Sequence, residues 1–374
     1  MPSANSSEPA RQGAARKTVF RFVFGSWRAW LLVFVPATAA LELAHAGGLW
    51  VFLASAVAIV PLAGLLGEAT EELALHVGPT AGGLMNVTLG NLGELIIAFF
   101  ALRSGHIDVV QASITGSIIG NALLVFGLSA FVGGLGRAQQ KFNRVLASVS
   151  TTMLTLAVAA LVMPAVFDLV VFGSLKVENR SVVLLSEWTA LVLILMYAAQ
   201  LVFTFVTHKD LTGAVEQRAP HLSLRAALAL LVVAAALVGW LSEVFVGAIE
   251  PATAALGMSK LFVGVIVVAM IGNAAEHAAA VMMARQDKMD LAVAISIGSS
   301  VQIALLVAPL LVITSFFMPH RLSLVFNPFE IAAVVLSVLI VHNICQDGET
   351  NWLEGLLMVG LYLILAIAFF FIPA

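Results

Sequence analysis

The sequence predicts an all-α polytopic membrane protein with about eleven transmembrane helices, and its composition and patterning carry that prediction. Of 374 residues, 61% are hydrophobic and 10% are charged, whereas a soluble domain is about 45–50% apolar and roughly 25% charged. A span needs about 20 apolar residues, so the chain has room for roughly ten or eleven helices. No segment alternates apolar and polar residues as a barrel strand does, so a helical bundle is the expected fold.

The composition also excludes two other classes of protein. The chain carries 18 Lys and Arg against 21 Asp and Glu. A nucleic-acid binder would have a basic excess, which is absent. The lone cysteine, Cys345, excludes a disulfide scaffold.

Apolar runs separated by short polar or Gly/Pro breaks place the helices in order. The expected spans are 29–47, 49–77, 80–104, 108–134, 143–171, 184–207, 222–248, 256–286, 290–317, 325–344 and 351–372. The stretch Ala44-His45-Ala46 before Gly47 is similar to a cleavable signal. The long polar tail and Glu42 beside the cleavage point favour a retained first helix.

Lysine and arginine predict the orientation of these spans. With the N-terminus inside and the ends counted alternately, the inner loops hold 13 of the 18 and the outer loops hold 5. This bias predicts a cytoplasmic N-terminus, a C-terminus outside and an odd number of spans.

An internal repeat is present at an offset of 182 residues. Gly90-Asn91-Leu92-Gly93-Glu94 falls on Gly272-Asn273-Ala274-Ala275-Glu276, and 14 of 39 positions are identical between 90–128 and 272–310. The copies lie on the third and eighth expected helices. Five spans is an odd offset, so the copies cross the membrane in opposite directions, as in the inverted repeats of secondary transporters.

The repeat divides the chain into five expected segments. They are a polar basic tail over 1–28, an extra first helix over 29–48, a first five-helix repeat over 49–207, a connecting loop over 208–222 and a second five-helix repeat over 223–374. The binding site of such transporters lies near mid-membrane, where the halves meet.

Acidic residues are the only charged groups expected deep in the membrane, where a charge costs about 2.5–3.5 kcal/mol. An acid-only interior attracts cations or protons and argues against anionic substrates. The acids are Glu68, Glu71, Glu72, Glu94, Glu187, Glu243 and Glu276.

Two of these acids, Glu94 and Glu276, are the predicted centre of the site. Each follows an asparagine by three residues, so Asn91 and Asn273 share a helix face with them and are predicted as further metal ligands. The preceding glycines, Gly90 and Gly272, are either helix-packing residues or points that loosen the helix. The next helix of each half adds further neutral oxygens, from Ser117, Asn121, Ser299, Ser300 and Gln302.

Paired carboxylates among neutral oxygens suit a hard divalent cation such as Ca2+. Two neighbouring carboxylates in low dielectric cannot both ionise cheaply, so without metal at least one should hold a proton. Competition between metal and protons for this site would couple their transport. Glu71, Glu72 and Glu243 are expected either to serve proton or cation access or to lie at helix ends facing water.

The two Gly-Asn-x-x-Glu segments resemble the paired signatures of the cation/proton exchanger branch of the calcium/cation antiporter superfamily. Similar supporting stretches are Ala69-Thr70-Glu71-Glu72-Leu73-Ala74, Ser242-Glu243, Thr207-His208-Lys209 and Ser299-Ser300-Val301-Gln302-Ile303. The resemblance covers the second to eleventh helices. It implies an eleven-helix Ca2+/H+ antiporter with Glu94 and Glu276 as central ligands. The loop over 208–222 departs from the family in lacking a pronounced acidic run.

The expected function is therefore exchange of Ca2+ for H+ by alternating access, with Ca2+ as substrate, no cofactor, no nucleic-acid partner and a prokaryotic plasma membrane as location. The first alternative is the same fold exchanging Mn2+, Na+ or K+ for H+. An intramembrane metalloenzyme using Glu276-His277 is disfavoured because the second histidine of a zinc helix is missing. A passive channel is disfavoured by the inverted repeat. The sequence leaves the oligomeric state open.

Overall fold

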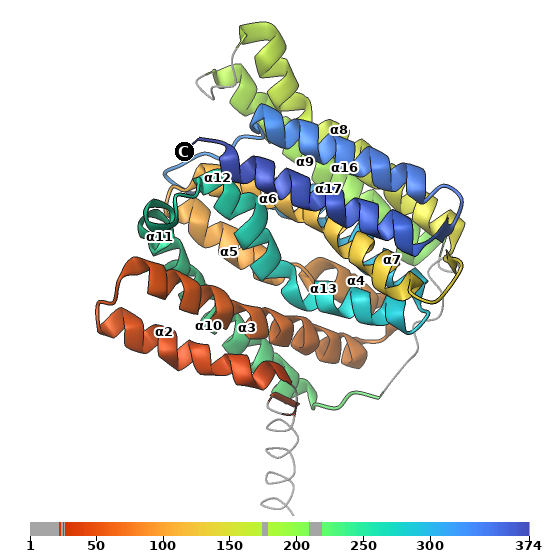
Figure 1. Cartoon of the computed structure of the whole chain (residues 1–374), viewed down its shortest axis with the longest axis horizontal. Coiled ribbons are helices and arrows are strands. Elements are labelled where there is room, and N and C mark those ends of the chain that lie inside the picture. The colour runs from red at the N-terminus through yellow and green to blue at the C-terminus, as the bar shows by residue number, and fades with distance from the viewer. Residues whose placement is uncertain (1–21, 24, 26, 174–178, 209–218, 374) are drawn as a thin grey trace, which may run out of the picture.

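The computed structural model describes residues 22–23, 25, 27–173, 179–208 and 219–373. Most of the expected tail over 1–28, and much of the expected loop over 208–222, lie outside the described residues. The described chain is a bundle of long helices (Figure 1), which confirms the all-helical prediction.

The first part of the bundle contains a 3-10 turn, α-helices, two π-helical segments and a two-residue strand. In chain order these are η1 (Trp27–Val33), α2 (Phe34–Leu43), α3 (Gly48–Val77), α4 (Pro79–Leu89), α5 (Leu92–Arg103), α6 (Ile107–Ile119), η2 (Gly120–Val125), α7 (Phe126–Gly134), β1 (Gln140–Lys141), α8 (Arg144–Phe172), α9 (Arg180–Val202) and η3 (Phe203–Thr207).

The second part has the same kinds of element. These are α10 (Leu224–Gly247), α11 (Ile249–Leu256), α12 (Lys260–Phe262), η5 (Val263–Val268), α13 (Ala269–Arg285), α14 (Met289–Gln302), η6 (Ile303–Val307), α15 (Ala308–Ser315), α16 (Pro328–Ile344), β2 (Glu349–Thr350) and α17 (Trp352–Phe371).

Nine helices in the described residues are long and apolar enough to cross a membrane, and two shorter apolar helices, Ala29–Leu43 and Pro328–Ile344, stand where the first and tenth spans are expected. The expected span 256–286 begins late, at Lys260. Gly257 has a φ of +66° and ends the separate helix α11, as a left-handed glycine commonly does.

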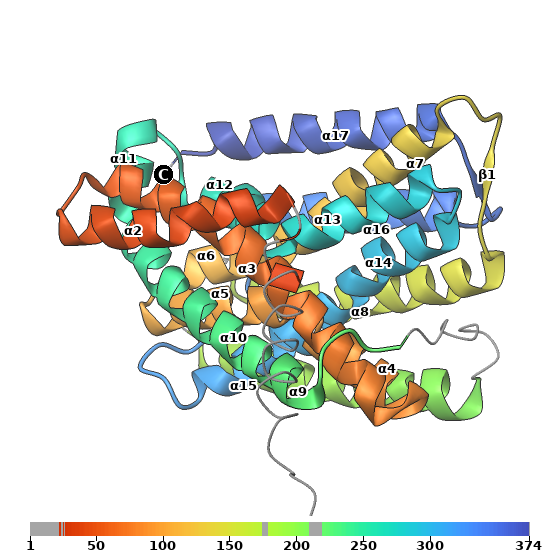
Figure 2. The same ribbon diagram turned by 90° about the horizontal axis from the view of Figure 1, so that it is seen from below.

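The helices pack in two groups around the segments that carry the repeated motif. The α3–α10 pair makes extensive contact, and α2 packs on α3. Figure 1 shows these three helices on one side of the bundle and α8, α9 and α16 on the other. Figure 1 also shows α13 between the two groups, and Figure 2 shows α14 beside α13. The buried core runs through the middle helices, where Ile118, Leu123 and Ala304 have no exposed surface.

A short antiparallel ladder joins two loops at one end of the bundle. Gln140 of β1 pairs with Thr350 of β2, so the α7–α8 connection is tied to the α16–α17 connection. The sequence pattern did not predict this pairing, because two residues on each side are too few to show a period.

Candidate cation-binding site

The first repeated motif interrupts a transmembrane helix. α4 ends at Leu89, α5 begins at Leu92, and Asn91 between them has φ −92° and ψ +26°. Glu94 therefore lies in the first turn of α5, where the helix dipole favours a negative charge. In the second motif the helix is continuous, but the π-helical segment η5 immediately precedes α13, and such segments are frequent at functional sites.

The glycine of each motif lies against the glutamate of the other. A Cβ atom on Gly272 would stand 2.9 Å from Cγ of Glu94, and one on Gly90 would stand 3.9 Å from Oε1 of Glu276. The absence of these side chains lets α5 and α13 approach closely. The structure thus brings Glu94 and Glu276 together, near enough to interact electrostatically.

Three oxygen atoms at this junction are buried and lack a hydrogen-bond partner. They are Oε1 of Glu94, Oε2 of Glu276 and Oδ1 of Asn273. An unsatisfied buried acceptor is unfavourable and rare in folded proteins. Two carboxylate oxygens and one amide oxygen form the start of the oxygen cage that Ca2+ takes. The donor set therefore fits a hard cation as cargo.

The oxygen of the other asparagine is already occupied. Asn91 Nδ2 donates to Oε1 of Gln302 at 2.6 Å, and Ser299 Oγ donates to Oδ1 of Asn91 at 2.9 Å. Asn273 instead donates through Nδ2 to Oγ of Ser117 at 3.2 Å and to the Ala269 carbonyl at 3.0 Å. Oδ1 of Asn91 thus accepts a hydrogen bond, whereas Oδ1 of Asn273 accepts none.

A cavity of about 540 Å³ reaches the two glutamates from one end of the bundle. Its wall includes Glu94, Glu276, Ser299 and Gln302 near mid-helix, and it extends along α3 to Glu71 and along α14 to Leu291. Leu291 lies close to Lys288, so the cavity extends toward the end of the bundle predicted to be cytoplasmic.

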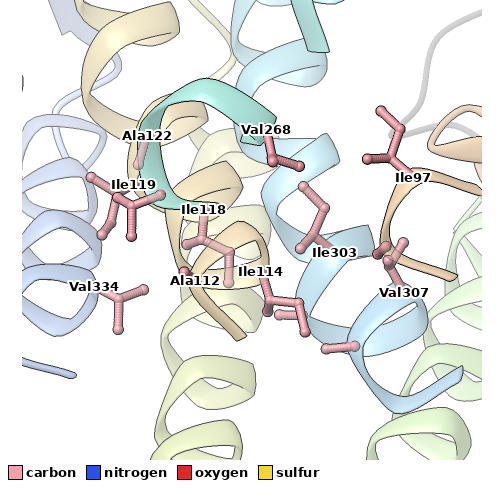
Figure 3. Close-up of a cluster of buried hydrophobic side chains, with 14 of the residues drawn as sticks. Ile97, Ala112, Ile114, Ile118, Ile119, Ala122, Val268, Ile303, Val307 and Val334 are labelled. Atoms are coloured by element: carbon pink, nitrogen blue, oxygen red, sulfur yellow. The ribbon is translucent and has the colours of Figure 1, made fainter. Parts of the chain in front are cut away.

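Apolar side chains close the opposite side of the site. A void of only about 10 Å³ lies beyond Glu94, among Ile114, Val268, Ile303 and Val307. Figure 3 shows these four side chains within a larger buried cluster. The site is therefore reached from one side and sealed on the other.

Two residues predicted to support the site point elsewhere. Ser300 Oγ donates to the Ser296 carbonyl of its own helix at 3.1 Å. The Asn121 amide oxygen pairs with Nε2 of His277 at 3.2 Å. Neither residue lines the cavity that reaches the glutamates. Their role as supporting residues stays a prediction.

Two of the three predicted access acids also lie away from the cavity. Glu72 is fully buried, and its carboxylate accepts the backbone N–H groups of His221 and Leu222 at 2.7 and 2.9 Å. It therefore anchors the start of the second half of the chain. Glu243 lines a different pocket with Glu42 and Trp240. Glu71 does line the cavity.

The sequence did not single out Glu68 or Asn86 as site residues, although both line the cavity. A signal for Glu68 was present, because Gly64-Leu65-Leu66-Gly67-Glu68 is similar to Gly239-Trp240-Leu241-Ser242-Glu243 at an offset of 175 residues. For Asn86, no neighbouring polar residue marks its position.

Within the part of the chain that the structure describes, no three His, Cys, Asp or Glu side chains are grouped so as to hold a metal ion. A site with two carboxylates must therefore complete its shell with amide, hydroxyl, backbone or water oxygens. That composition suits transient binding of a transported ion better than permanent chelation.

Comparison with known proteins identifies the family. Residues 47–206 and 226–371 match the family described as sodium/calcium exchanger protein. The chain belongs to this family. Members of this family are transporters, so the metalloenzyme alternative is rejected. The relatives described next confirm the resemblance to the cation/proton exchanger branch.

Several named exchangers match nearly the whole chain. A Ca(2+)/H(+) antiporter of Synechocystis is 44% identical, covering 92% of this chain and 96% of its own length. The Ca(2+)/H(+) antiporter ChaA of Bacillus subtilis is 42% identical, covering 90% and 96%. The structure of native YfkE superposes with a TM-score of 0.80 at 40% identity, covering 91% of this chain and 98% of that chain.

Proposed function

We propose that this exchanger moves Ca2+ in one direction and H+ in the other by alternating access, with Glu94 and Glu276 as the shared binding groups. Two relatives that are 44% and 42% identical to the chain are named Ca(2+)/H(+) antiporters. The observation that carries the residue assignment is the meeting of the two motifs, with an unpartnered oxygen on each glutamate.

Competition between metal and protons provides the coupling. Two adjacent carboxylates at membrane depth are costly as a pair of anions, so the empty site retains at least one proton. A divalent cation neutralises both carboxylates and expels the proton. The site is close to neutral when it holds either Ca2+ or protons, so the protein can change conformation in both of these states. It cannot do so when the empty site carries two negative charges.

The proposed topology places the N-terminus in the cytoplasm and the C-terminus outside. It is supported by the Lys and Arg bias between the two sets of loops. The cavity then opens to the cytoplasm, where a Ca2+ exporter loads its ion. Two five-helix halves, over 49–207 and 223–374, would exchange roles as the site turns outward.

The function is tested with the purified full chain in proteoliposomes. An imposed pH gradient, acid on the side opposite the 45Ca2+, is expected to drive 45Ca2+ movement against its own gradient, and nigericin in K+ buffer is expected to abolish it. Transport that persists after collapse of the pH gradient but requires Na+ would overturn the proposal in favour of Na+ coupling.

A further inference from the structure

Two helix crossings of equivalent sequence lie on either side of the glutamates, one closed and one open. We define the outer crossing as α6 against η5, and the inner crossing as α14 facing α4. The 182-residue register extends to both, since it relates Gly264 to Gly82, Ala112 to Ala294, and Gly116 to Gly298. The same three residues therefore stand at equivalent points in both crossings.

The outer crossing is packed backbone to backbone. A Cβ on Gly116 would lie 2.2 Å from the Val265 carbonyl oxygen, and a Cβ on Gly264 would lie 2.4 Å from Cβ of Ala112. Val109, one helical turn before Ala112 on α6, is 1% exposed. No residue larger than glycine fits either position while this crossing is closed.

The inner crossing is open, since neither of its glycines packs on the facing helix: Gly82 lies against the Ala74 carbonyl of α3 instead. A Cβ on Gly298 would meet nothing within 4 Å. Leu291, the equivalent of Val109, is 48% exposed. The cavity separates the two helices, with Asn86 and Val87 of α4 on one wall and Ala294 and Ile295 of α14 on the other.

Gly298 thus has no packing reason to be glycine in this conformation, and glycine in a helix interior costs about 1 kcal/mol relative to alanine. Its equivalent, Gly116, has a clear reason. We propose that Gly298 is a gate residue: when the site opens to the other side, α4 lies on α14 through Gly82 and Gly83, as η5 now lies on α6.

This inference rests on the proposed exchange by alternating access and assigns its inner closing contact. The segment that covers the exposed face of α14 is α4 of the same chain, because α4 is the repeat equivalent of η5, which packs on α6. Closure would cover Leu291, Ala294 and Gly298 and would remove the cavity that now reaches Glu276. The outer crossing would then separate, because the site must open to the other side and both sides cannot be open at once.

The first test is Gly298→Ala, with Gly360→Ala on α17 as matched control, since Gly360 also has nothing within 4 Å. The added methyl fits the present conformation, so we expect an unchanged melting temperature and unchanged Ca2+ binding. Exchange is expected to fall at least about tenfold, because overpacking disfavours the closed inner crossing. The control should match the parent in all three measurements.

The outcomes separate this inference from the proposed function. If the parent exchanges Ca2+ for H+ and Gly298→Ala exchanges at the same rate, the gate assignment is wrong. If the parent itself shows no proton-driven Ca2+ movement, the proposed function fails.

A second test detects closure of the inner crossing by disulfide cross-linking. In a Cys345→Ala background, Asn86→Cys with Ile295→Cys spans the inner crossing, and the register makes Val268→Cys with Ser113→Cys the equivalent outer pair. Both pairs should form disulfides, detected by gel mobility, while the pH gradient and Ca2+ drive turnover. A pre-formed outer disulfide should stop Ca2+ exchange, because the outer side can then no longer open. An inner pair that never cross-links during turnover would overturn the inference.

Discussion

The two Gly-Asn-x-x-Glu segments share their residues but not their chemistry. The oxygen of Asn91 accepts a hydrogen bond from Ser299, and its amide group donates to Gln302. The oxygen of Asn273 is buried and unpartnered. A repeated motif therefore does not imply two equivalent ligands. The site has two similar acids, and we propose that Asn273 binds the cation directly while Asn91 positions its neighbours.

The residue facing each asparagine from the next helix explains the difference. Gln302 occupies the position that Gly120 holds in the other half of the 182-residue register. The first motif thus meets an amide side chain, whereas Asn273 donates to Oγ of Ser117 and to the Ala269 carbonyl of its own helix. This difference between the repeats accompanies the different hydrogen bonding of the two asparagines.

The largest expected effect comes from the acids, which should behave alike. Glu94→Gln and Glu276→Gln each remove one of two buried charges and leave the cation poorly compensated. Losing a buried charge partner costs about 3 kcal/mol or more, so Ca2+ affinity measured by calorimetry should fall at least about 100-fold. A large loss in one variant with none in the other would break the equivalence of the two acids.

The asparagines should differ, with Asn273→Ala having the larger effect on affinity. It removes an oxygen that has no other partner. If that oxygen contributes about as much to Ca2+ binding as a hydrogen bond, about 1.4 kcal/mol, the Ca2+ dissociation constant should rise roughly tenfold. Folding should be little affected. Equal affinity in Asn273→Ala and the parent would show that this oxygen is not a ligand.

Asn91→Ala should act on stability more than on affinity. It removes the hydrogen bonds to Gln302 and from Ser299, each worth about 1 kcal/mol, which is expected to lower the melting temperature. The Ca2+ dissociation constant should change less than about threefold. A tenfold loss of affinity with unchanged melting would reverse the assigned roles of the two asparagines.

The smallest effect is expected at the pair behind the second motif. His277→Ala removes one neutral hydrogen bond to Asn121, worth about 1 kcal/mol, and neither residue lines the cavity. Stability should fall slightly while Ca2+ affinity stays unchanged. A larger Ca2+ dissociation constant in this variant would show that the site includes the far face of α13.

The fold and the centre of the site could be predicted from sequence because each rests on a period or a repeat. Apolar length predicts spans, and the duplicated Gly-Asn-x-x-Glu predicts that Glu94 and Glu276 meet. The directions of single polar side chains could not be predicted. Ser300 and Asn121 are within a turn or so of site residues, yet Ser300 donates within its own helix and Asn121 pairs with His277.

Two further features depend on contacts between distant segments. Glu71 and Glu72 are adjacent, yet one lines the cavity and the other binds the backbone at His221 and Leu222. A sequence of two consecutive acids does not show which faces water. The open inner side and the sealed outer side were equally hidden, since the repeat makes both sides look the same.

The central claim is that metal and protons compete for the two glutamates, and proton release on Ca2+ binding tests it most directly. Purified protein in weakly buffered detergent solution is mixed with CaCl2, and the pH is followed with an indicator dye. The account predicts that the parent protein releases protons and that the Glu94→Gln, Glu276→Gln double variant releases none. Proton release of parental size from the double variant would contradict it.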